Sequence, residues 1–146
     1  MRGKCDISRG YGDNPLLFRI FRVYDDATPR GKRLIESVIA LTRKQFPGEK
    51  RRVIERIPKT MRDPVSKKLR AVLFVATGGD EEVLGFALLY HSTNPDFCYL
   101  DYLATLPSKM GRGIGSALYE RLREECSNLG SRGLFFECLP DDNLFC

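Results

Sequence analysis

Three glycines at alternate positions, Gly111, Gly113 and Gly115, lie where a helical pattern begins. The first turn of a helix has amide N–H groups without partners inside the helix, and the aligned peptide dipoles attract an anion such as a phosphate to them. Glycine has no Cβ atom to keep an anion from the backbone, and it tolerates positive φ. The spacing GxGxG matches neither the dinucleotide fingerprint GxGxxG nor the phosphate loop GxxxxGK[ST]. The stretch therefore indicates an anion cradle, and a plain turn is the alternative.

The histidine and the cysteines of the sequence do not indicate a catalytic or metal site. The single histidine, His91, lies in an apolar stretch and has no partner in the sequence for a metal site or a serine–histidine pair. The five cysteines are an odd number at wide spacing, so they predict neither a disulfide framework nor a metal knuckle. We expect reduced, mostly buried thiols. They are Cys5, Cys98, Cys126, Cys138 and Cys146.

The length and composition fit one globular domain, with 146 residues of which 42% are hydrophobic. We divide the chain into an N-terminal extension, 1–15, and a single domain, 16–146. The N-terminal residues contain no apolar run typical of a secretory signal, and no segment approaches the length of a membrane-spanning helix. We therefore expect a soluble, cytoplasmic protein that does not contact membranes.

The net charge of the chain is +5, and positive charge is concentrated between Arg43 and Arg70. This segment contains eleven basic residues and only three acidic ones. Such a segment attracts nucleic acid, an acidic protein or a phosphorylated ligand. It contains no aromatic ring between Phe46 and Phe74 on which a base could stack, so a solvated helical face is the favoured interpretation and nucleic acid is a poorly supported partner.

Hydrophobic periodicity predicts the strands and helices that must position the glycines. Runs of apolar or alternating residues predict strands, and apolar residues at helical spacing predict helices. The order is β-α-α-β-β-β-α-β, an α/β (α+β) fold with helices on both faces of a mixed, mainly antiparallel sheet. The last strand is expected to be buried and parallel to the strand before the last helix. The predicted ranges are Leu16–Tyr24, Thr28–Phe46, Lys50–Met61, Ala71–Thr77, Val83–Tyr90, Phe97–Leu106, Ile114–Leu129 and Gly133–Leu139.

The strand ending LATLP, followed by SKM and then GRGIGSAL at a helix start, resembles the signature of the GNAT acyltransferase superfamily. The family motif [RQ]xxGx[GA] falls on residues 110–115. The resemblance covers roughly Leu16 to Leu139. It implies a GNAT-like fold, acetyl-coenzyme A as cofactor, and direct transfer of the acetyl group to a primary amine.

The same resemblance implies which residues hold the coenzyme. The pyrophosphate would lie on the amides of Gly111, Arg112, Gly113, Ile114, Gly115 and Ser116, and the thioester and pantetheine along Leu103, Ala104 and Thr105. Met110 stands where the family has arginine or glutamine, so one phosphate-facing side chain is lost. Lys109 or Arg112 has the charge to substitute for it.

Family members often place a general base on the central strand, and here Asp101 is the only carboxylate of the segment Tyr99–Tyr102. Enclosure between two tyrosines would desolvate it and raise its pKa, which suits a base, with Tyr99 acting beside it through water. The alternative is a carboxylate that faces water or a hydrogen-bond network. Glu137 is a second, lower-ranked carboxylate in an apolar strand.

Only seven residues follow Leu139, whereas the family continues with a helix and two strands that complete one wall of the cleft. We expect a domain that lacks these pieces, so a longer protein, a dimer partner, or a coenzyme site without turnover all stay open. An apolar edge left uncovered would favour association. The prediction is an N-acetyltransferase acting on a small-molecule or peptide amine, and a basic binding module or an inactive coenzyme-binding domain is the alternative.

Overall fold

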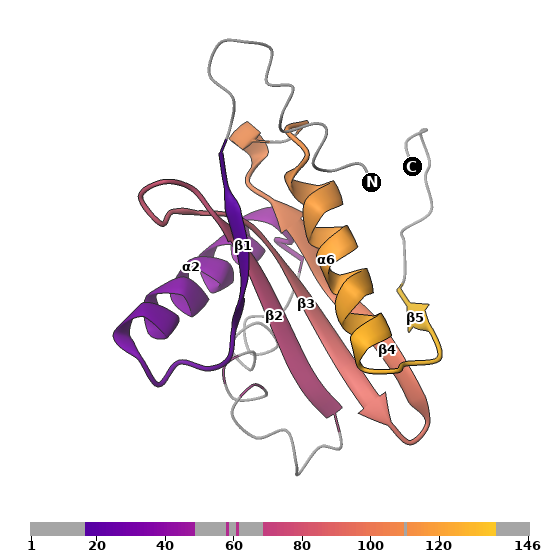
Figure 1. The fold of residues 1–146 in the computed structure, drawn as a ribbon. Helices are drawn as coiled ribbons and strands as arrows, with labels where there is room; N and C mark the ends of the chain where they lie inside the picture. Colours follow the sequence, from indigo (N-terminus) through magenta and orange to yellow (C-terminus); the bar gives the residue numbers. More distant parts are fainter. Residues whose placement is uncertain (1–16, 49–57, 59–60, 62–68, 110, 137–146) are drawn as a thin grey trace.

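A computed structural model describes residues 17–48, 58, 61, 69–109 and 111–136. The helices and strands follow the predicted order (Figure 1). They are β1 (Arg19–Val23), α2 (Pro29–Gln45), β2 (Leu69–Thr77), β3 (Val83–Thr93), β4 (Asp96–Thr105), the 3-10 turn η1 (Pro107–Lys109), α6 (Ile114–Asn128) and β5 (Leu134–Phe135).

The five strands form one sheet in the order β1-β2-β3-β4-β5. Strands β1 to β4 pair antiparallel, and β5 is parallel to β4. The predicted mixed, mainly antiparallel sheet and the predicted parallel last strand are therefore confirmed.

The two described helices cover opposite faces of this sheet. In β2 the side chains of Leu73 and Val75 pack with α2, whereas Val72 and Phe74 pack with α6. Side chains alternate across a strand, so a strand covered on both faces must be apolar at every position. This explains the uninterrupted run AVLFVAT and places one core layer on each side of the sheet.

Helix α2 starts and ends as its sequence predicts. Thr28 is the N-cap, and its Oγ1 accepts a hydrogen bond from the Gly31 N–H over 3.0 Å, while Pro29 fits the first turn. At the other end the Phe46 N–H donates to the Thr42 carbonyl oxygen over 2.8 Å. The buried side of the helix turns toward the sheet and fixes where its C-terminal end lies relative to β4.

Two predicted elements fall largely outside the described residues. Of the helix expected over Lys50–Met61, only Pro58 and Met61 are described, both helical, and Met61 is buried beside α2. Of the strand expected over Gly133–Leu139, the described part is β5. Its Phe135 is 58% exposed and the following Phe136 is 47% exposed, so the expected burial of this strand is wrong for these residues. The N-terminal extension and Cys5, Cys138 and Cys146 also lie outside the described residues.

No helix in the described part of the chain combines the length and the apolar character needed to span a membrane.

Candidate functional site

The turn that leads into α6 has the backbone geometry that its glycines permit. Gly111 and Gly113 have φ of +80° and +85°, values that side-chain-bearing residues rarely adopt. Gly113 is the N-cap of α6, and it provides no side-chain cap, in contrast to Thr28 at α2. A Cβ built on Gly111 would meet nothing within 4 Å. The start of α6 thus has no side-chain cap, and the turn before it has open space at Gly111, as an anion cradle requires.

Strand β4, which precedes this turn, carries a β-bulge. Tyr102 is opposite Leu88 and Leu100 is opposite Leu89, so Asp101 is the one extra residue that β4 carries between two neighbouring positions of β3. The bulge reverses which side chains face which helix. Before it Leu100 packs on the α6 side, and after it Tyr102 packs on the α2 side.

The second edge of β4 is paired over only part of its length. Strand β5 pairs with β4 at Cys98 and Tyr99, where the Cys98 N–H also donates to the Gly133 carbonyl oxygen over 2.8 Å. Figure 1 shows β5 beside only one end of β4. From Leu100 to Thr105 this edge pairs with no strand among the residues that the structure describes, and its last three residues, Leu103 to Thr105, border a groove.

A groove of about 380 Å³, here called the β4 groove, lies where these features meet. It is lined by the C-terminal end of α2, the last residues of β4 and the start of α6. Because α2 and α6 lie on opposite faces of the sheet, a groove that touches both must pass around the unpaired edge of β4. The lining residues are Gln45, Phe46, Leu103, Ala104, Thr105, Gly111, Gly113, Ile114, Gly115 and Ser116.

Eight of the predicted coenzyme-binding residues thus lie together around one groove. The start of α6 and the end of β4 approach closely at Gly115, where an added Cβ atom would lie 3.6 Å from Thr105 Oγ1. Lys109, which is half-buried, and Arg112, which is exposed, flank the groove in η1 and in the glycine turn. Met110 lies outside the described residues.

The predicted catalytic pair is placed differently from expectation. Asp101 is exposed because it is the extra residue of the bulge, so the predicted enclosure between two tyrosines is not observed. Tyr99 is half-buried and lies opposite Tyr90 on β3. Neither residue lines the β4 groove, although Asp101 is only two positions before Leu103. Glu137 lies outside the described residues.

The sequence interpretation missed three residues at this site. Gln45 and Phe46 line the groove from α2, and Gln45 continues the helical spacing of Leu41 and Thr42, which was a usable signal. Gly85 in β3 allows α6 to approach, since a Cβ there would lie 2.8 Å from the Ala104 carbonyl oxygen and 3.2 Å from Ile114 Cγ2. A glycine inside an apolar strand signals such an approach.

Comparison with known proteins decides the family. The Acetyltransferase (GNAT) family model matches residues 35–145, which is most of the chain. The chain belongs to the GNAT family. A search of curated proteins finds no match to it.

Solved structures show the same fold as this GNAT chain. Tetrahymena GCN5 is 16% identical, with a TM-score of 0.71 over 83% of this chain and 71% of that one. The aminoglycoside N-acetyltransferase AAC(6')-Iy in complex with CoA is 17% identical, with a TM-score of 0.64 over 88% and 82%. A ribosomal-protein-alanine N-acetyltransferase from Brucella melitensis biovar Abortus 2308 is 17% identical, with a TM-score of 0.61 over 86% and 85%. At such identities the likeness extends to the fold and not to the acceptor.

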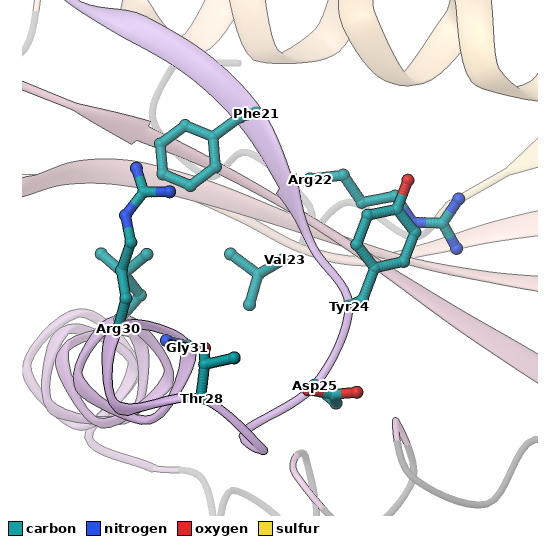
Figure 2. Close-up of a pocket in the computed structure, with 9 residues that line it drawn as sticks. Phe21, Arg22, Val23, Tyr24, Asp25, Thr28, Arg30 and Gly31 are labelled. Carbon is teal, nitrogen blue, oxygen red and sulfur yellow. Dashed lines mark hydrogen bonds between the residues drawn. The ribbon is translucent and has the colours of Figure 1, made fainter.

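A second hollow in the GNAT chain, of about 200 Å³, lies between β1 and the start of α2. Figure 2 shows Phe21 and Arg30 on one side of β1, and Arg22 and Tyr24 on the other. Both guanidinium groups are already engaged. Arg30 donates to Glu81 over 3.0 Å and lies 4.5 Å from the Phe21 ring centre, and Arg22 pairs with Glu125 over 3.4 Å. Arg30 thus links α2 to the β2–β3 turn and Arg22 links β1 to α6, so the side chains around the hollow hold the two helices against the sheet.

Two cysteines and the histidine of the GNAT chain lie among the described residues, and all three are buried. Cys98 and Cys126 are free, buried thiols on β4 and α6. Burial, reinforced by the neighbouring Cys98, raises the pKa of the Cys126 thiol to about 12, so it stays protonated and weakly nucleophilic near neutral pH. His91 is buried and pairs with Asp96 over 3.2 Å at the β3–β4 turn. Among the described residues no three potential ligands gather around a metal site.

Proposed function

We propose that the chain is an acetyl-CoA-dependent N-acetyltransferase that transfers an acetyl group to a primary amine. One observation carries the proposal. The uncapped start of α6, with its positive-φ glycines, and the unpaired edge of β4 border the same groove. A cradle for phosphates next to a strand edge able to pair with amide groups fits a long ligand with a diphosphate and a peptide-like arm.

The groove residues fit coenzyme A in chemistry as well as in placement. The amides of Gly111 to Ser116 would bind the pyrophosphate, and the β4 edge at Leu103 to Thr105 would pair with the pantetheine amides. Lys109 and Arg112 carry the positive charge that Met110, at the family's arginine or glutamine position, does not supply. The AAC(6')-Iy structure, which has the same fold, is a complex with CoA and supports this assignment.

When bound, acetyl-CoA would supply the acetyl group as a thioester: a C–N bond to the neutral amine forms, the C–S bond breaks, and coenzyme A leaves as the thiol with the proton that the amine nitrogen loses. We assign Asp101 to remove the proton from the incoming ammonium, and Tyr99 to assist it through water. Backbone N–H groups on the unpaired β4 edge would donate to the carbonyl oxygen as negative charge develops there. Asp101 is exposed, so an amine in solvent could approach this side chain.

The acceptor is proposed only as an amine on a small molecule or a peptide. The related folds include an aminoglycoside acetyltransferase and a ribosomal-protein-alanine acetyltransferase, whose named acceptors differ widely in size. We also propose that a second copy or a further domain completes the wall beside β5. The free thiols Cys98 and Cys126 suit a reducing compartment such as the cytoplasm.

The proposal is tested by calorimetric titration of the chain with coenzyme A, and with a duplex oligonucleotide at two salt concentrations. Gly113→Val should weaken coenzyme binding at least tenfold, because a branched side chain enters the space that the phosphates need. Gly130→Val is the matched control, since Gly130 also has positive φ, +73°, but lies at the other end of α6.

The control should lose similar backbone stability and keep its affinity for coenzyme A. Normal coenzyme affinity in Gly113→Val would remove the phosphate assignment. Salt-sensitive binding to DNA without any binding of coenzyme A would replace the whole proposal with the basic binding module.

A further inference from the structure

The β4 groove has two ends that can be told apart. Thr105 marks the phosphate end, because its hydroxyl lies beside Gly115 at the start of α6. A strand advances about 3.3 Å per residue, so Tyr102 lies about 10 Å farther along β4. The Phe46 ring centre is 5.2 Å from that of Tyr102. Phe46 therefore lines the end of the groove that is distant from the phosphate cradle.

The backbone of Phe46 holds this ring in place. Phe46 is the residue at which α2 ends, and its N–H donates to the Thr42 carbonyl oxygen over 2.8 Å. Thr42 is itself fully buried, and its hydroxyl donates to the Val38 carbonyl oxygen over 2.7 Å. The attachment point of the ring is thus fixed by the last turn of a buried helix face.

The space behind the ring is filled. Phe46 packs on Tyr102, which is 7% exposed, and the Tyr102 ring centre is 6.4 Å from that of the fully buried Phe86. This row of three aromatic rings runs from the groove into the core beneath α2. Cores are packed closely, so Phe46 has no space into which it can withdraw when a larger ligand enters the groove.

We propose that Phe46 closes the acyl end of the β4 groove and limits the acyl group to acetyl or a group of similar size. The inference rests on the proposed function, because it takes the phosphate end to hold coenzyme A and the opposite end to receive its acyl group. A butyryl group extends two methylene groups beyond acetyl and would meet the fixed ring. Replacing the ring with a methyl group opens apolar space in which those methylene groups are buried.

The test compares the affinities of unmodified chain and Phe46→Ala for coenzyme A, acetyl-CoA, butyryl-CoA and hexanoyl-CoA by titration calorimetry, which requires no acceptor. The unmodified chain should bind butyryl-CoA at least tenfold more weakly than acetyl-CoA. In Phe46→Ala this ratio should fall or reverse, by roughly tenfold for two newly buried methylene groups. Phe46→Leu, which keeps more of the packing on Tyr102, should shift the ratio in the same direction by a smaller factor.

The matched control is Phe97→Ala. Phe97 is also a half-buried aromatic residue that packs on another ring, Phe135, at 6.0 Å, but it lies at the other end of β4. It should lose stability and leave the ratio of affinities unchanged. Equal affinity of the unmodified chain for butyryl-CoA and acetyl-CoA, or an unchanged ratio in both Phe46 variants, would overturn the inference alone. If the unmodified chain bound no coenzyme A ligand, the proposed function would be overturned and the inference with it.

Discussion

At the scale of single residues, Asp101 is the position where local geometry and proposed chemistry coincide. It is the extra residue of the β4 bulge, it is exposed, and it lies two positions before the segment that lines the groove. Bulges commonly redirect a side chain next to a site of reaction. A general base in this position would be reached from solvent and not from the core.

Asp101→Asn keeps the size of the side chain and removes its capacity to take a proton. We expect kcat for acetylation of an amine to fall by roughly 10²- to 10⁴-fold, the usual contribution of a general base, while the affinity for coenzyme A changes little. The measurement is thiol release from acetyl-CoA across a panel of amines and a range of pH. Asp96→Asn is the control, because Asp96 is also a carboxylate of β4 but pairs with His91 away from the groove. An unaltered rate and pH profile in Asp101→Asn would exclude Asp101 from the mechanism.

At the scale of elements, α6 is placed by its close contact with the sheet at Gly85. A Cβ at this position would lie 2.8 Å from the Ala104 carbonyl oxygen, a backbone atom that cannot rotate away, and 3.3 Å from Leu118 Cδ1. Any side chain at Gly85 must therefore push α6 or β4 outward. Both elements border the β4 groove, so the packing of β3 controls the shape of the site.

Gly85→Ala should destabilise the fold by about 1–3 kcal/mol through overpacking and should also weaken coenzyme A binding, since the two sides of the groove move apart. Thermal unfolding and calorimetry measure the two effects. Gly79→Ala in the β2–β3 turn is the control, because a Cβ there meets nothing within 4 Å. Equal unfolding temperatures for the two variants would show that the sheet accommodates the added atom.

The sequence predicted these elements well where periodicity carried the information. Ile114, Leu118 and Leu122 recur at helical spacing and form the buried side of α6, and the apolar run of β2 correctly indicated cover on both faces. The bulge at Asp101 could not be predicted, because one inserted residue leaves an apolar strand still apolar. The proposed role of Phe46 at the acyl end of the groove could not be predicted from the sequence for a different reason. Its contact with Tyr102 joins positions 56 apart in the chain, and local pattern does not encode such pairs.

At the scale of the whole molecule, the edge of the sheet at β5 carries two exposed aromatic residues that are adjacent in the sequence. Phe135 is 58% exposed and Phe136 is 47% exposed, and their rings meet those of Phe97 and Tyr119 edge-on. Neighbouring exposed aromatic rings on a strand edge favour contact with another apolar surface. This agrees with the proposal that a second copy or a further domain covers the wall beside β5.

Phe135→Lys should therefore reduce self-association of the chain, because it puts a charge on the edge where the apolar contact would form. Sedimentation velocity over a range of concentrations measures the change. Tyr24→Lys is the control, since Tyr24 is 68% exposed and lies on β1's side of the molecule, at the opposite edge of the sheet. Self-association that is the same in both variants, or a monomeric unmodified chain, would count against this surface as a contact between copies.

The bulge in β4 has a consequence that extends along the strand on both sides of it. Every second residue of β4 faces α6 before the bulge, at Cys98 and Leu100. After the bulge the residues that continue this spacing, Tyr102 and Ala104, face α2 instead. The first half shares its edge with β5, and the second half leaves that edge for a ligand. Deleting Asp101 would remove the bulge and leave strict alternation, with Leu100 and Leu103 toward α6 and Tyr102 and Ala104 toward α2. A single-codon deletion would thus straighten β4 without exchanging the two core layers, so its effect on activity would come from the lost carboxylate and the lost bend and not from a repacked core.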